Sequence, residues 1–114
     1  MNEYILAYIT TANEAEAMRI GRSLVERRIA ACANVIPAMR SIYRWKGDLC
    51  EDEEAVLIVK STAARENELT EAVLALHSYE CPCLAIVPIR AGNPAYFDWI
   101  TESTTVDPGA ADRS

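Results

Sequence analysis

Two uninterrupted apolar runs constrain the fold of this chain more than any other feature of its sequence. Residues 4–9 (YILAYI) and residues 55–59 (AVLIV) are rich in β-forming side chains, and neither run contains proline. Strands with this pattern are usually buried on both faces. We therefore expect both runs to lie in the centre of one sheet, with a neighbouring strand on each side.

Two further extended segments contain proline. Residues 31–47 form a long segment that is interrupted by Pro37, and residues 84–89 form a short one that contains Pro88. Proline cannot donate to the ladder of a sheet, so it is confined to edge strands and bulges. The sequence therefore places both segments at the edges.

A long hairpin should join one edge to the centre. The segment 31–47 reaches a turn at residues 46–48 (KGD), and residues 50–62 return with an acidic start and an apolar end. Two strand-like runs separated by a short turn that contains glycine predict a hairpin.

Helices are predicted in three places. Asn13 and Glu16 form a capping pair at the start of the first helix, which should fade near residues 28–29. The second helix spans about residues 64–76, where apolar residues recur at helical spacing. A short third helix follows Asn93 and Pro94, which suit a cap and a first turn.

The resulting order is βαββαβ with a C-terminal helix, the ferredoxin-like α+β arrangement. That fold places the four strands in the order 4-1-3-2, which agrees with the positions of the prolines. We expect a single domain over residues 1–103 and a disordered tail over residues 104–114, which are polar and small.

Composition excludes several classes of function. The 114 residues include 11 Lys and Arg against 17 Asp and Glu, a formal net charge of −6. A nucleic-acid binder or an anionic-membrane binder usually needs a basic face, so neither partner is expected. No apolar run is long enough to cross a membrane, and the opening residues lack the features of a signal peptide. We therefore predict a cytoplasmic protein with reduced cysteines.

One face of the sheet should remain apolar and uncovered, unless the strand ends and the last helix cover it. Both long helices are expected on the same face, whereas the runs 4–9 and 55–59 are apolar on both. An exposed apolar face of this kind favours an interface between copies of the chain. Tyr43, Trp45 and Phe97, together with Trp99, are candidate anchors of that interface.

Five stretches of the chain occur in a distinctive order: ERRIAACANVIP, SIYRWKG, EAVLIVKST, HSYECP and YFDWI. With these stretches the chain resembles a known family, the CutA divalent-cation tolerance proteins. It implies a homotrimer that is similar in build to the PII signalling proteins, in which long hairpins extend sheets across subunits. It also implies a cytoplasmic bacterial protein linked to tolerance of divalent metals, copper above all, with no established catalytic activity.

The resemblance also implies a cleft between subunits. The matching positions here are Cys32, Trp45, Lys60, His77, Tyr79 and Glu80, with Trp99 near by. Lys60 ends an apolar run, so its ammonium must either reach out to water or find a partner. Glu80 is a natural counter-charge across the interface. Cys32 follows two alanines, and a buried packing role is favoured for it.

The stretch LHSYECPCLAIVPI raises the question of whether the chain has a metal-binding site, since it contains His77, Cys81 and Cys83. Imidazole and thiolate suit copper and zinc. Copper-linked family members place a thiol where this chain has Ile9, and paired histidines where it has Leu76 beside His77. We therefore expect a weak Cu²⁺ or other divalent-metal contact at His77, packing for Cys83, and no obligatory cofactor. Residues 51–54 (EDEE) are expected to be a solvated part of the hairpin.

Two other classes of function stay open. The first is a small acylphosphatase-like hydrolase, which would need an anion cradle and an arginine after the first strand. The loop TTANE offers neither glycine nor arginine there. The second is a trimeric scaffold or sensor that presents its surface to a partner and binds no metal.

Overall fold

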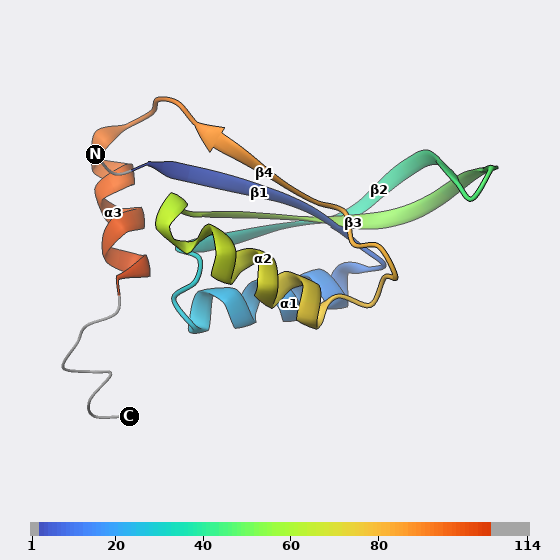
Figure 1. Cartoon of the computed structure of the whole chain (residues 1–114), viewed down its shortest axis with the longest axis horizontal. Coiled ribbons are helices and arrows are strands. Elements are labelled where there is room, and N and C mark those ends of the chain that lie inside the picture. Colours follow the sequence, from blue (N-terminus) through green and yellow to red (C-terminus); the bar gives the residue numbers. More distant parts are fainter. Residues whose placement is uncertain (1–2, 106–114) are drawn as a thin grey trace.

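The computed structural model describes residues 3–105 as one four-stranded antiparallel sheet with helices (Figure 1). The elements are β1 (Tyr4–Thr11), α1 (Glu14–Glu26), β2 (Cys32–Trp45), β3 (Asp48–Thr62), α2 (Glu66–Leu76), β4 (Leu84–Ile89) and α3 (Pro94–Thr104), with a 3₁₀ turn η1 (Ala63–Arg65) before α2. This order confirms the predicted α+β class and the βαββαβ pattern with its terminal helix. Within residues 3–105, no helix is both long and apolar enough to span a membrane.

The sheet order is β2-β3-β1-β4, so the two proline-free strands are central, as predicted. Tyr8 of β1 lies opposite Ile58 of β3 and Ala85 of β4. Pro88 lies in edge strand β4, and Pro37 lies where the β2–β3 register shifts. Both prolines thus avoid positions where a central ladder bond would be lost.

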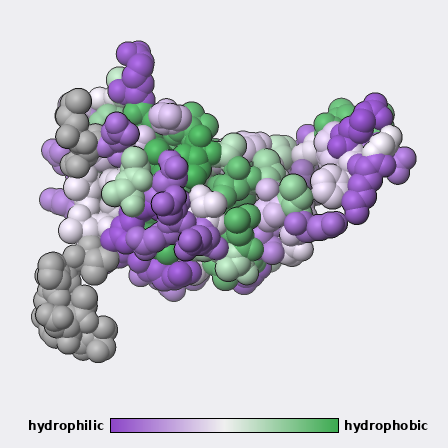
Figure 2. Space-filling model, viewed as in Figure 1, coloured by the Kyte–Doolittle hydropathy of each residue, from purple (hydrophilic) through white to green (hydrophobic). Residues whose placement is uncertain are grey.

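The β2–β3 hairpin projects from the body of the sheet as an arm (Figure 1). Trp45 pairs with Asp48, and the two residues between them, Lys46 and Gly47, have φ angles of 50° and 86°. Positive φ at both loop positions defines the tight turn that matches the twist of a hairpin. β3 therefore starts at Asp48, two residues before the predicted start. Hydrophilic side chains gather at the tip of the arm (Figure 2).

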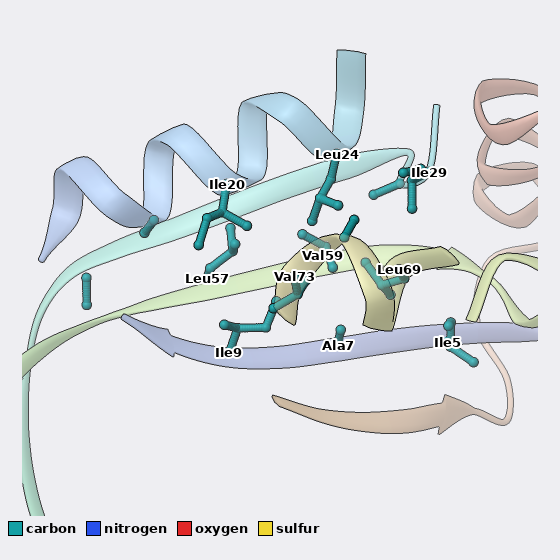
Figure 3. Close-up of a cluster of buried hydrophobic side chains, with 14 residues drawn as sticks. Ile5, Ala7, Ile9, Ile20, Leu24, Ile29, Leu57, Val59, Leu69 and Val73 are labelled. Atoms are coloured by element: carbon teal, nitrogen blue, oxygen red, sulfur yellow. The ribbon is translucent and has the colours of Figure 1, made fainter. Parts of the chain in front are cut away.

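The core fills the space between the sheet and the helices α1 and α2 (Figure 3). Ile20 and Leu24 of α1 are fully buried, as are Leu69 and Val73 of α2. They meet the alternate residues of the central strands that face them, namely Ile5, Ala7, Ile9, Leu57 and Val59. Gly21 lets α1 approach closely, because a Cβ there would lie 3.0 Å from both Ala33 Cβ and Leu57 Cδ1.

Helix α1 begins as predicted and ends early. Asn13 Oδ1 accepts a hydrogen bond from the backbone N–H of Glu16 at 2.9 Å, which confirms the cap. The helix was expected to fade near residues 28–29, but it ends at Glu26. Arg28 adopts a left-handed φ of 59°, and the N–H groups of Ile29 and Ala30 both donate to Leu24 O. This C-terminal cap was missed because glycine, its usual residue, is absent.

The opposite face of the sheet lacks a helical layer over most of its area. Leu6, Tyr8 and Ile58 are only half-buried there, and Val87 is 47% exposed. α3 covers one end of the sheet, where Phe97 stacks on Tyr4 with ring centroids 4.6 Å apart. α3 ends at Thr104, and of the tail predicted to be disordered, residues 106–114 lie outside the described residues.

Candidate functional site

A cavity of about 580 Å³ lies where the hairpin arm leaves the sheet. Its walls come from the end of β1, from both strands of the arm and from the segment between α2 and β4. They include Trp45, Glu54, Tyr79, Glu80, Cys81 and Cys83. Three predicted cleft residues, Trp45, Tyr79 and Glu80, are therefore brought together within one chain.

Glu54 is the buried acid of this cavity, with 9% of its surface exposed. Tyr79 Oη donates a hydrogen bond to Glu54 Oε2 at 2.6 Å. Burial, and then this bond to a carboxylate, raises the pKa of Tyr79 well above its usual value. The prediction that residues 51–54 are solvated holds for Glu51, Asp52 and Glu53. It is wrong for Glu54, because Tyr79 closes over that side chain.

His77 positions Tyr79. Its Nε2–H donates to Thr10 O at 2.7 Å, and its Nδ1 accepts from the backbone N–H of Tyr79 at 3.1 Å. Since a carbonyl only accepts and an N–H only donates, these two contacts fix one neutral tautomer. A metal ion at His77 would have to displace one of the two bonds. The metal role of His77 stays a prediction.

Glu16 anchors the same segment from the start of α1. Its carboxylate accepts from the N–H of Ala12 at 3.0 Å and from the N–H of Ser78 at 2.9 Å. Burial alone would raise the pKa of Glu16, but the hydrogen bonds from Ser78 and Ala12 outweigh burial and lower it. The segment after α2 is thus tied to both β1 and α1.

Trp45 and Glu80 stand at the exposed mouth of the cavity. Lys46 Nζ lies 3.5 Å from Glu80 Oε2 and 5.6 Å from the centroid of the Trp45 ring. Both charged side chains are largely exposed, and surface pairs of this kind stabilise a fold only slightly. Within one chain, Glu80 therefore meets Lys46. The predicted contact between Glu80 and Lys60 concerned two subunits and stays a prediction.

The other predicted cleft residues lie at the far end of the sheet, beside α3. Lys60 is the cross-strand partner of Cys32, and its Nζ donates to Asn34 Oδ1. Lys60 lies six positions beyond Glu54 along β3, a distance of about 20 Å. One chain therefore does not bring Lys60 and Cys32 to the cavity.

Aromatic side chains of α3 accompany this second group. The Tyr96 and Trp99 rings stack with centroids 5.7 Å apart, and Tyr96 Oη lies 3.7 Å from Cys32 Sγ. Burial and the Cys32 contact raise the pKa of Tyr96 to about 12. Cys32 is half-buried in the single chain. The packing role favoured for it stays a prediction.

The two cysteines of the Cys-Pro-Cys stretch line the cavity, and both are exposed. Cys83 is therefore not packed within the single chain, and the packing role predicted for it stays a prediction for the assembly. The hydrogen bond from Thr10 N to Cys83 O at 3.3 Å places Cys83 opposite Thr10, on the face that the helices leave uncovered. Among the residues that the structure describes, no three His, Cys, Asp or Glu side chains group closely enough to hold a metal ion.

Glu54 and Tyr43 are cavity residues that sequence reasoning did not select for the site. Tyr43 Oη donates to Asp52 Oδ2, and both Tyr43 and Glu54 face the cavity. The available signal was the position of Glu54 directly before the apolar run of residues 55–59. An acid at the edge of a buried run needs a donor, and Tyr79 is that donor.

Comparison with known proteins decides the family. Residues 5–103 match the family described as CutA1 divalent ion tolerance protein. The chain belongs to the CutA1 family. It is 45% identical to the divalent-cation tolerance protein CutA of Thermus thermophilus, over 91% of this chain and 99% of that protein. It is 47% identical to the Protein CutA homolog of Xenopus laevis, over 82% of this chain and 62% of that protein.

Solved CutA1 structures have the same fold. A crystal structure of the divalent ion tolerance protein CutA1 from Ehrlichia chaffeensis matches with a TM-score of 0.88 at 27% identity. The match covers 93% of this chain and 99% of that one. The CutA1 fold therefore extends over nearly all of the chain.

Proposed function

We propose that this CutA1 protein acts in the tolerance of divalent metal ions, copper above all, by weak binding of a metal or a small ligand at clefts between subunits in the cytoplasm. The observation that carries the proposal is the family match over residues 5–103. The Thermus thermophilus relative, 45% identical, is named for divalent-cation tolerance.

The proposed assembly is a homotrimer similar in build to the PII signalling proteins. Two features of the single chain support self-association. The face opposite α1 and α2 presents apolar side chains, with Ile36 and Val87 each 47% exposed. The edge strands β2 and β4 also have unpaired outer edges within the described chain. Apolar faces and free edges are the surfaces that oligomers bury.

Assembly would also explain why the predicted cleft residues form two groups. Trp45, Tyr79 and Glu80 line the cavity at the arm, whereas Cys32 and Lys60 lie beside α3. A second copy, with its arm against the α3 end of the first, would bring the two groups together. Lys60 and Glu80 would then meet as the predicted pair of opposite charges.

The metal would be a reversible ligand. Both ring nitrogens of His77 are engaged by backbone groups: Nε2–H donates to Thr10 O, and Nδ1 accepts from the N–H of Tyr79. A metal ion at this ring would therefore compete with those hydrogen bonds. This competition predicts weak binding, consistent with a response to excess metal. No turnover is expected, because the proposed role is binding.

Three measurements test the proposal. Light scattering on dilution should give the mass of three chains, and a monomer at micromolar concentration would contradict the proposed trimer.

Calorimetric titration with Cu²⁺ and Zn²⁺ should show weak binding that His77→Ala reduces, and identical isotherms would remove His77 from the site. Expression in cells that lack their own CutA1 protein should restore growth at raised copper, and unchanged sensitivity would count against tolerance as the role.

A further inference from the structure

Helix α3 is held at its C-terminal end by two arginines that lie outside it. Arg65 Nε and Nη2 donate to Thr104 O at 3.1 and 2.7 Å, and Arg28 Nη1 donates to Ser103 O at 3.3 Å. Arg65 belongs to the turn η1, and Arg28 follows α1, so two separate elements hold the same helix end. All of these contacts lie within one chain, so they do not depend on the proposed assembly.

The last turn of α3 supplies no cation for its own end. Residues 101–104 read TEST, with one acid and no base. The carbonyl groups at a helix C-terminus carry partial negative charge, which cations stabilise. Arg65 is suited to this role, because its side chain is only 18% exposed and Glu68 accepts from its Nη1 at 2.9 and 3.1 Å. The carboxylate thus orients the guanidinium toward Thr104 O.

The backbone of Arg28 is strained, and its side chain contacts α3. Its φ of 59° lies in the left-handed region, where glycine is the usual residue at the end of a helix. Glycine would relieve this strain and would lose the hydrogen bond to Ser103 O. The contact with α3 is therefore a physical reason for an arginine at this position.

The other contacts of α3 hold the start and the middle of the helix. Phe97 stacks on Tyr4, and Tyr4 Oη lies 2.7 Å from Thr101 Oγ1. Ile100 is fully buried, but it does not belong to the core beneath α1 and α2. α3 has 11 residues and is about 16 Å long. Without the arginines, the helix would be free to tilt about its contact with Tyr4.

We propose that these two arginines are positioning residues that set the tilt of α3, and thereby the place of Tyr96 and Trp99 in the cleft. The two rings stack on each other, and Tyr96 Oη lies 3.7 Å from Cys32 Sγ. A change in tilt would move both rings relative to Cys32. The proposal rests on the proposed function only in taking this group as part of the cleft.

Hydrogen exchange of the full, assembled protein tests the hold on α3. Arg65→Met keeps the apolar stem and removes the donors. The amides of α3 should then exchange about tenfold faster or more, since a hydrogen bond from a charged group contributes that much. Arg65→Lys keeps the charge without the fork of donors, so its exchange should lie between the two. Arg22→Met, at an exposed position of α1, is the control for the loss of one positive charge.

Arg28→Gly separates the hold on α3 from general stability. Relief of the left-handed backbone offsets the lost contact, so the free energy of unfolding should stay the same or rise. The amides of α3 should nevertheless exchange about two- to tenfold faster, because they lose the contact with Ser103 O. The amides of α1 and β3 should not exchange faster.

Trp99 reports the position of α3 in the folded protein. The chain contains two tryptophans, so Trp45→Phe leaves Trp99 as the single one. In that background, Arg65→Met should shift the native emission of Trp99 to longer wavelength and increase its quenching by acrylamide. Arg65→Lys should restore part of the original signal. A contact that only stabilises the fold would leave the native emission unchanged.

Unchanged exchange of α3 in Arg65→Met and Arg28→Gly, or an unchanged Trp99 signal in Arg65→Met, would overturn the proposal. None of these readouts needs a bound metal, so they separate this proposal from the proposed function. If α3 and Trp99 respond and even the wild type does not restore copper tolerance, the positioning stands and the proposed function fails. If the wild type restores tolerance and the variants leave α3 and Trp99 unmoved, the proposed function stands and the positioning fails.

Discussion

The hydroxyl of Tyr79 donates a 2.6 Å hydrogen bond to the carboxylate of Glu54. This contact joins the segment after α2 to the base of the arm on β3. It accounts for the burial of an acid that the sequence places in a charged stretch. It also forms one wall of the cavity that contains three of the predicted cleft residues.

Removal of this hydroxyl should destabilise the protein. Tyr79→Phe leaves the Glu54 carboxylate buried without its donor, and we expect a loss of about 1.5 kcal/mol, the low end for a bond to a charged acceptor, because Tyr79 is half-buried. Urea unfolding of wild type and variant at one fixed protein concentration measures this loss of stability. Tyr43→Phe removes the exposed bond to Asp52 and should change stability little. Equal losses in the two variants would contradict a special role for Glu54.

Stability should fall at alkaline pH through the tyrosines. Burial and the Cys32 contact raise the pKa of Tyr96 from 10.0 to about 12. A raised folded-state pKa contributes stability that is complete below the unfolded value and is lost as pH rises through the folded value. The loss should therefore run from about pH 10 to about pH 12. Tyr96→Phe should flatten that part of the curve in unfolding measurements, and a curve as steep as that of wild type would contradict the assignment.

Acid should lower the stability of the fold through Glu16. Its pKa is lowered in the folded state from 4.5, so its contribution is complete above pH 4.5 and is lost as pH falls through the folded value. Glu16→Gln keeps the shape of the side chain and removes the charge. We expect it to lower stability at neutral pH and to reduce the acid dependence, as followed by circular dichroism. Glu14→Gln, at an exposed position in the same turn, is the control.

A methyl group at Gly21 should push α1 away from the sheet. The added Cβ of Gly21→Ala would stand 3.0 Å from Ala33 Cβ, which is fixed to the β2 backbone. Overpacking costs about 1–3 kcal/mol, against a helix-propensity gain of about 1 kcal/mol. We expect a net loss in thermal unfolding. Ala15→Gly, at an exposed site of the same helix, isolates the propensity effect, and a stabilised Gly21→Ala variant would refute close packing.

Local patterns predicted most of the fold. The proline-free runs became the central strands β1 and β3, and Pro37 and Pro88 fell in edge strands. The Asn13 cap formed as expected. These features depend on neighbouring residues and on whether a strand lies at the edge or in the centre of the sheet. Proline positions and the pattern of apolar side chains indicate both directly.

The cavity was harder to predict because its walls come from three distant segments. Trp45, Tyr79 and Glu80 were selected through the resemblance, whereas Glu54 was expected to be solvated and Cys83 to be packed. Nothing local to residues 51–54 distinguishes Glu54 from its acidic neighbours. Only the segment after α2, held by His77 and Glu16, brings a donor to that carboxylate.

The sequence by itself determined the order of elements, the central pair of strands and the family, since each of these is written in short-range periodicity or in a continuous run of matched residues. The tertiary structure alone decided which polar groups are buried and which distant segments line one cavity. The physical reason is that burial depends on groups brought together through space. Glu54 is buried by a tyrosine from another segment, and both cysteines of the segment after α2 line the same cavity as residues of the arm.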